Sequence, residues 1–283
     1  MSSSAYRVCA LHCTALLITL MATLGTNTYL VGTGHDRILI DTGEGRPEWL
    51  ASLKEAVTAE STNISTVILT HWHHDHISGV PDLLSLFPQA QIYKNNPALK
   101  GDPTVWKDIQ DGQRFSVDGA VLRALHCPGH TTDHMALILE DEDAMFTGDN
   151  VLGHGTAVFE DLATYMASLE TMASKVTGRA YPGHGDVIED GRGRMLQYIS
   201  HRKQREDQVL EVLAQAKKGQ VKADGDGISS MEIVKTIYVD VPENLHEAAE
   251  RGVVQILQKL ASEGKAEDVQ RGRWQALLPS ANL

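Results

Sequence analysis

Cysteine is scarce in this sequence. The 283 residues include only three cysteines, Cys9, Cys13 and Cys127. This odd, small number does not provide the disulfide framework typical of secreted proteins. A reduced compartment inside the cell is therefore expected, and we predict a cytoplasmic protein. The start of the chain contains serine and no acid before Asp36, so a mitochondrial location is the alternative. Because Cys127 has no paired base in the sequence, we expect it to be a small hydrophobic residue rather than a nucleophile.

The chain also lacks a convincing membrane-spanning run. Val8–Leu24 is largely apolar, but it is on the short side for a membrane helix and has little flanking charge beyond Arg7. It contains no clear cleavage site of a signal peptide. We therefore expect no stable membrane association and predict an edge strand at Ala15–Met21. Residues 1–24 are set apart as an N-terminal segment without an assigned role.

Basic residues are outnumbered by acidic ones. The chain has 25 Lys+Arg against 37 Asp+Glu, a formal net charge of -12. Nucleic-acid affinity comes largely from neutralising phosphates, so general polyanion binding by the whole surface is disfavoured. A local basic groove is still compatible with this charge. One run on a predicted helix is suited to dock an acidic carrier protein, its phosphopantetheine arm or RNA. Its members are Arg192, Arg194, Arg202, Lys203 and Arg205.

Histidine, in contrast, is concentrated in one stretch. Thr70-His71-Trp72-His73-His74-Asp75-His76 follows Val67-Ile68-Leu69, whose β-branched, apolar residues predict the end of a buried strand. In an extended segment His71 and His73 point to the same face, and Asp75 and His76 follow as the chain turns. Imidazole nitrogens and carboxylate oxygens are ligands for Zn²⁺, and a catalytic site keeps one position open. These ligands are too many for one open site, so they predict two metals, or one metal and a catalytic aspartate.

The remaining chain reads as strands in two runs with helices between them, followed by a small module. Strands are predicted at residues 28–32, 37–41, 66–69, 91–93, 113–117, 120–125, 134–139, 144–147 and 179–181, helices at 47–59, 81–87, 162–172 and 193–216, and a loop at 94–111. This pattern predicts an α/β domain over residues 25–216, in which two sheets pack between helices.

Residues 217–227 are predicted to form a linker to a winged-helix-like module at 228–283. Ser229 is placed to cap a helix, and a second helix at 242–263 has one apolar stripe. Two strands, at 265–269 and 274–278, are expected to form the wing. Because the second helix carries Glu243, Glu247 and Glu250, it is not a basic recognition helix. A packing or dimerisation role is favoured over nucleic-acid binding, and a homodimer is one expectation.

Four further motifs accompany the histidine-rich stretch. They are Leu39-Ile40-Asp41-Thr42-Gly43, Pro128-Gly129-His130-Thr131, Thr147-Gly148-Asp149-Asn150 and Tyr181-Pro182-Gly183-His184-Gly185. In this order, and with H-x-H-x-D-H, they make the sequence similar to the metallo-β-lactamase superfamily from Gly25 to the C-terminus. The resemblance implies the αββα four-layer sandwich of that family.

The resemblance also implies two Zn²⁺ ions per chain. Mn²⁺ or iron are alternatives, because ligand type alone does not fix the metal. The implied ligands are His71, His73 and His130 for one metal, Asp75, His76 and His184 for the other, and Asp149 between both. Asp75 is also the implied catalytic residue, which orients a metal-bound hydroxide or passes its proton. Three more residues are expected to support the ligands by hydrogen bonds or to contact substrate: Asp41, His134 and His154.

Segments around the ligands narrow the resemblance to the β-lactamase-like protein 2 group. These segments are residues 25–31, 149–155, 158–162, 198–202 and 242–246. The animal member is a mitochondrial endoribonuclease that cuts single-stranded RNA. Similar fungal proteins are acyl-carrier-protein thioesterases, which release aromatic polyketides such as atrochrysone carboxylic acid from a non-reducing synthase. Both reactions use hydroxide attack, on carbonyl carbon or on phosphorus, so the ligand set does not separate them.

Three classes of function are open at this point. The favoured one is a thioesterase of secondary metabolism that acts on an acyl-carrier protein or polyketide-synthase thioester, because the acidic charge disfavours RNA and residues 149–155 resemble the fungal proteins. The second is a single-strand RNA endoribonuclease. It is supported by residues 242–260, whose sequence resembles that of the endoribonuclease branch. The third is a non-enzymatic, metal-containing nucleic-acid-binding protein. The third is disfavoured because structural zinc sites are normally closed by four protein ligands. A secreted β-lactamase is disfavoured by the lack of a clear export signal.

Overall fold

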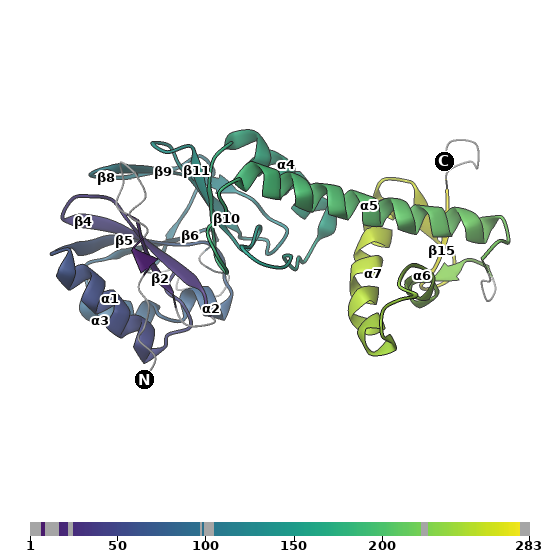
Figure 1. The fold of residues 1–283 in the computed structure, drawn as a ribbon, viewed down its shortest axis with the longest axis horizontal. Coiled ribbons are helices and arrows are strands. Elements are labelled where there is room, and N and C mark those ends of the chain that lie inside the picture. The colour runs from purple at the N-terminus through teal and green to yellow at the C-terminus, as the bar shows by residue number, and fades with distance from the viewer. Residues whose placement is uncertain are drawn as a thin grey trace. The chain divides into compact units, whose positions relative to one another are not determined.

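The computed structural model describes residues 7–8, 17–21, 25–96, 98, 105–221 and 226–277. The chain forms two compact units. Unit 1 comprises residues 1–160 and 164–196, and unit 2 comprises residues 161–163 and 197–283. Figure 1 shows the elements of both units, and each unit is described by itself. Within the described stretches, no helix has the length and apolar character needed to cross a membrane.

The first sheet of unit 1 has seven strands in chain order. They are β1 (Arg7–Val8), β2 (Leu17–Met21), β3 (Asn27–Val31), β4 (Asp36–Ile40), β5 (Asn63–Leu69), β6 (Gln91–Lys94) and β7 (Lys107–Asp108). The first four strands pair antiparallel, and β4 to β7 pair in parallel. The strand predicted at Ala15–Met21 is present over residues 17–21, but its predicted position at the edge is wrong, because β2 pairs with β1 on one side and with β3 on the other. The first two residues of the predicted strand, like Cys9 and Cys13, lie outside the described part of the chain.

Alternating side chains of the parallel strands supply two hydrophobic cores. On β4 and β5, Leu39 and Val67 face the helices, where α1 (Pro47–Ala59) adds Leu53. Ile40 and Ile68 point the other way, into the core between the two sheets. The helix α3 (Val80–Leu86) completes the outer layer through Val80 and Leu83. The predicted α1 is confirmed residue for residue; its proline lies in the first turn, where a missing N–H costs no helical hydrogen bond.

The second sheet closes the inner core. Its strands are β8 (Arg114–Val117), β9 (Ala120–His126), β10 (Met135–Leu139), β11 (Ala144–Gly148) and β12 (Ala180–Pro182), in the order β12-β11-β10-β9-β8. Leu122, Leu137 and Phe146 meet the isoleucines of the first sheet. Helix α4 (Leu162–Lys175) packs near the second sheet, where the Tyr165 hydroxyl donates to the Asn150 carbonyl at 2.6 Å. The predicted αββα sandwich is confirmed.

Three local features differ from the sequence prediction. Strand β5 begins at Asn63 rather than residue 66. The sequence did not show this, because the buried Ile64 stands alone among the polar, partly buried Asn63, Ser65 and Thr66. The predicted loop at 94–111 contains β7, whose two side chains are exposed and therefore leave no hydrophobic signal. A short helix, α2 (His74–Ile77), forms within the second half of the histidine-rich stretch and turns the chain there.

Unit 2 contains the later part of α5 (Gly191–Lys217) and a winged-helix module. The module consists of β13 (Ile228–Ser229), α6 (Ser230–Ile237), the 3-10 turn η1 (Glu243–Leu245), α7 (His246–Ser262), β14 (Ala266–Asp268) and β15 (Arg273–Ala276). Ser229 caps α6 in a reciprocal capping box with Glu232, as predicted. The expected helix at 242–263 is divided into η1 and α7. The predicted winged-helix-like module is confirmed; of the predicted linker, residues 222–225 lie outside the described residues.

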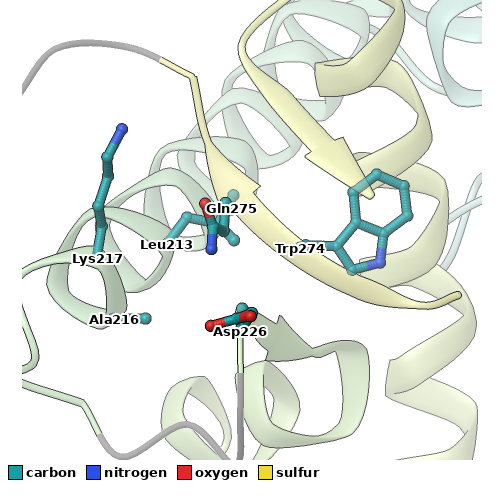
Figure 2. A pocket seen from close by; sticks show the side chains of 7 residues that line it. Leu213, Ala216, Lys217, Asp226, Trp274 and Gln275 are labelled. Carbon is teal, nitrogen blue, oxygen red and sulfur yellow. The ribbon is translucent and has the colours of Figure 1, made fainter. Parts of the chain in front are cut away.

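A cavity of about 180 Å³ lies in unit 2 beside the end of α5 and β15. Figure 2 shows Leu213 and Lys217 on α5, and Trp274 and Gln275 on β15, among its lining side chains. Lys217 Nζ donates to the Ala276 carbonyl at 3.0 Å, which ties its charge to the strand. Neither of the two groups of metal-ligating side chains found among the described residues lies there.

Candidate metal centre

The metal loop, residues 70–76, begins where β5 ends. Parallel strands end at one edge of a sheet, so the turn after β4 places Asp41 beside the loop. In the second sheet, Asp149 follows β11 and His184 follows β12, while His130 precedes β10. The structure brings together all seven predicted ligands in two groups. They are His71, His73, His130 and Asp149 in the first, and Asp75, His76 and His184 in the second.

The first group has three imidazole nitrogens in mutual contact. His71 Nε2 lies 3.1 Å from His73 Nδ1, and His130 Nε2 lies 3.0 Å from His73 Nδ1 and 3.3 Å from His71 Nε2. One ligand atom from each of the four side chains falls within 4.8 Å of all the others. A single ion can therefore touch all four side chains.

The Nδ1 atoms of His71 and His130 make hydrogen bonds that determine which ring nitrogen carries the proton. His130 Nδ1 lies 2.7 Å from the Val158 carbonyl, which only accepts, so this nitrogen carries the proton. His71 Nδ1 lies 3.0 Å from Thr70 Oγ1, whose own proton is donated to Asp41. Both Nε2 atoms are then bare lone pairs that face each other at 3.3 Å. His73 Nδ1 lies within 3.1 Å of both atoms, so one cation placed among the three nitrogens would bind a lone pair of each ring, and the residues fit a metal ion.

In the second group, Asp75 Oδ2 lies 3.2 Å from His184 Nε2 and 3.6 Å from His76 Nε2. His76 Nε2 is buried without a hydrogen-bond partner. Asp149 faces both groups, because its Oδ2 lies 3.2 Å from His184 Nε2 and 3.6 Å from His130 Nε2. A carboxylate in this position lies within reach of an ion in either group; its role as a ligand shared by two metals, which the family resemblance implies, stays a prediction.

Asp41 lies behind the ligands. Its Oδ2 accepts from His76 Nδ1 at 2.8 Å, and its Oδ1 accepts from the Thr70 backbone N–H at 2.8 Å. The side chain is buried, and the backbone adopts a φ of 59°. A carboxylate that holds the outer nitrogen of a metal-ligating histidine fixes the tautomer and the ring orientation. This placement matches the predicted supporting role of Asp41.

His134 is fully buried behind the first group. Its Nε2 accepts the backbone N–H of Asp149 at 3.1 Å, so it orients the carboxylate that faces both groups. A Cβ on Gly148 would lie 2.6 Å from this nitrogen, which explains the glycine. Of the two predicted roles, support of a ligand fits this burial and contact with substrate does not. His154, in contrast, is exposed and belongs to neither group; its contact with substrate stays a prediction.

Burial and charge divide the histidines into two kinds. Burial lowers the pKa of His71 well below its usual value, and the neighbouring His76 adds repulsion. Burial also opposes a charge on His76, but the carboxylates of Asp149 and Asp41 raise its pKa well above the usual value. Hydrogen bonds to Asp149 and Asp75 likewise outweigh burial and raise the pKa of His184 to about 9. Metal binding must therefore displace protons from the second group, and its affinity should rise with pH.

Several supporting residues were not found by sequence reasoning. The backbone N–H of Asn27 donates to the Gly183 carbonyl at 2.7 Å, and its side chain donates to Pro182 and Gly185. These bonds hold the turn that carries His184. Thr26 Oγ1 donates to Asp75 Oδ2 at 3.2 Å. The sequence signal that could have indicated these contacts is the polar pair Thr26-Asn27, which lies at the start of the largely apolar strand β3.

Cys127 is expected to resist alkylation in the folded protein at pH 8. Its side chain is fully buried, and burial raises the pKa of the thiol to about 12. Only about one thiol in ten thousand would then be ionised. Mass spectrometry of the peptide that contains Cys127, after iodoacetamide treatment, measures the labelling, and the same treatment in denaturant is the control. Equal labelling rates in both conditions would contradict the prediction.

Comparisons with known proteins agree with this geometry. Residues 22–184 match the family described as Metallo-beta-lactamase superfamily, and residues 229–274 match the Beta-lactamase associated winged helix domain. The "Lactamase-like protein adaB" of Aspergillus niger is 45% identical over 268 residues, which cover 91% of this chain and 82% of that relative.

Two further proteins extend the comparison. The "Atrochrysone carboxyl ACP thioesterase dmxR1" of Cryptosporiopsis sp. is 46% identical over 249 residues, covering 85% of this chain and 76% of that relative. Among solved structures, a metallo-beta-lactamase family protein from Thermus thermophilus has a TM-score of 0.69 at 20% identity, covering 93% of this chain and 98% of its own. At that identity the likeness concerns the fold alone.

Proposed function

The chain belongs to the metallo-beta-lactamase superfamily, and we propose that it is a metal-dependent thioesterase that releases an acyl or polyketide chain from an acyl-carrier protein. The observation that supports hydrolysis is the pair of bare imidazole nitrogens, on His71 and His130, that face each other beside Asp149. Such a group is built to receive a cation.

Each of the two groups of side chains would bind one metal ion. His71, His73 and His130 would hold one metal, Asp75, His76 and His184 would hold the other, and Asp149 lies within reach of both groups. When bound, the metals polarise the scissile carbonyl and lower the pKa of a water molecule. Asp75 can take a proton on its carboxylate and pass it to the leaving sulfur. The Asp75 side chain is 20% exposed and that of Asp149 10%, so Asp75 is the more accessible of the two carboxylates to a substrate.

The choice of a thioester is supported by the relatives and by charge. A protein 46% identical to this chain is named as an acyl-carrier-protein thioesterase. Helix α7 of the winged-helix module is not a basic recognition helix, because its first turn carries the exposed Glu247. A net charge of -12 further disfavours a polyanionic substrate.

We propose Zn²⁺ as the native metal, because imidazoles beside carboxylates suit zinc. Manganese and iron accept the same ligands, so metal analysis of protein purified without added metal decides among them. The partner is an acyl-carrier protein or the carrier domain of a polyketide synthase. We place the enzyme in the cytoplasm, where such carriers would meet it.

Hydrolysis of an acyl-carrier-protein thioester is the expected activity. The metal-loaded protein is mixed with a carrier protein bearing an acyl phosphopantetheine thioester, and free thiol and free acid are both measured. A labelled single-stranded RNA is tested in parallel, and Asp75→Ala is the control for contaminating hydrolases. Cleavage of the RNA and not of the thioester, lost in the variant, would replace this proposal with the endoribonuclease. Cleavage of neither substrate by protein that contains metal would refute both.

A further inference from the structure

A buried lysine lies at the edge of the first sheet, next to the metal loop. Lys94 is the last residue of β6 and pairs with Leu69, the last residue of β5. Its side chain has no exposed surface. An ammonium group in such a place is costly unless every donor is used. Nζ donates to the carbonyls of Asn95 at 3.0 Å and Asn96 at 3.3 Å.

The third partner of Lys94 comes from the other sheet. Asp133 Oδ2 lies 2.5 Å from Lys94 Nζ, and the Asp133 side chain is equally buried. Asp133 belongs to the turn that precedes β10, in the second sheet. The ion pair therefore joins the first sheet to the second, just where the metal loop begins.

Asp133 also controls the turn that carries His130. Its Oδ1 accepts from Thr131 Oγ1 at 2.7 Å, and the Thr131 carbonyl accepts from the Gly129 N–H at 3.0 Å. These bonds close the turn on both sides of His130. The imidazole of His130 is held separately by the Val158 carbonyl at 2.7 Å. Lys94, through Asp133, therefore holds the backbone of the turn that contains His130, and the Val158 carbonyl fixes the orientation of the His130 imidazole.

Stability alone gives a weak reason to keep this pair. Replacing a buried ion pair by apolar side chains of similar volume is often neutral or stabilising. In some proteins, however, buried ionic groups specify one arrangement of the chain, and here Lys94 and Asp133 each make further hydrogen bonds to defined partners. A metal ligand needs such a defined position.

We propose that the Lys94–Asp133 ion pair is a positioning device that fixes His130 within the first metal group. The inference rests on the metal centre of the proposed function. Neither residue belongs to the two groups of metal-ligating side chains; both act through the turn at Gly129–Thr131. Removing the pair should leave the fold in place and loosen one ligand of one metal.

The test compares Lys94→Met with the double variant Lys94→Met/Asp133→Asn, which contains no uncompensated charge. Lys107→Met, an exposed lysine on the neighbouring strand β7, is the matched control. Metal content per chain and competition with a chelator are measured, together with the melting temperature of the metal-free protein. Loss of an indirect support of a metal ligand typically lowers affinity about 10–100-fold. We expect a loss of this size for one of the two metals in the double variant, with a melting temperature close to that of the parent and a fall in kcat at nearly constant KM.

Each outcome has a defined meaning. Parent protein that binds no metal would refute the metal centre itself. Parent and double variant with the same two affinities would overturn the positioning role and leave the metal centre intact. If both Lys94 variants fail to fold while Lys107→Met folds, the pair supports the whole domain, and the proposal is again overturned. Loss of affinity for one metal in a folded double variant would support it.

Discussion

Asp149→Asn is expected to lose metal from both groups and to lower hydrolysis by on the order of a thousandfold. The Asp149 carboxylate lies within 3.6 Å of His130 Nε2 and 3.2 Å of His184 Nε2, which belong to different groups. Because loss of an outer partner of a ligand already costs about 10–100-fold, loss of a carboxylate shared by two metals should cost more. The asparagine keeps the volume, so the backbone bond from Asp149 to His134 should persist.

Metal content by elemental analysis and kcat/KM for a thioester are the measurements for this variant. Asp207→Asn, an exposed residue of α5, is the control for loss of one negative charge. Metal content below one per chain in Asp149→Asn, with the control at the parent value, is the expected pattern. Loss of a single metal, with the other retained at full affinity, would show that Asp149 serves one group only.

The metal-free form of this variant offers a second measurement. The pKa of His76 is raised, against the effect of burial, by Asp149 and Asp41 together. Removing one of these charges should lower that pKa toward the usual value, because Coulomb attraction to a carboxylate favours the imidazolium. NMR titration of His76 in the metal-free variant and parent would report the difference. An unchanged titration would assign the effect to Asp41 alone.

The ligands could be predicted from the sequence because their chemistry is local. His71, His73, Asp75 and His76 lie within one short stretch, so their spacing alone indicates a metal site. His130, Asp149 and His184 were assigned through a family resemblance, and the structure brings all of them together. Spacing could not have shown this, because the distance between segments is set by how two sheets pack.

The supporting contacts could not be predicted for a related reason. The bond from His130 to Val158 uses a backbone carbonyl, which leaves no trace in residue identity. The Lys94–Asp133 pair joins residues from different sheets, and each alone looks like a surface charge. Helix α1 was predictable to the residue because its apolar spacing and its proline agree. Strand β7 was not, because it has only two residues, and their exposed, charged side chains give no apolar alternation.

Asp75→Ala should abolish hydrolysis while leaving the fold intact. Asp75 Oδ2 accepts from Thr26 Oγ1 and lies 3.2 Å from His184 Nε2. Burial opposes its charge, but the bond to His184 holds the pKa of the carboxyl well below its usual value, so it is an acceptor at neutral pH. Its side chain is partly exposed at the start of α2, so truncation leaves no closed cavity and costs little stability. Loss of a positioned acid–base group typically costs a factor of about 10²–10⁴, and loss of the second metal adds to this.

His74→Ala is the matched control for this prediction, because its side chain is 83% exposed in the same helix turn and belongs to neither metal group. The melting temperatures of both variants should stay within a few degrees of the parent. Metal analysis then separates the two roles of Asp75. If Asp75→Ala retains about two metals per chain and no turnover, its carboxylate acts on the proton. If it retains one metal and no turnover, the dominant role is that of a ligand. Near-normal turnover in Asp75→Ala would remove Asp75 from the mechanism, and the acid–base role would have to pass to Asp149, the remaining carboxylate that faces both groups.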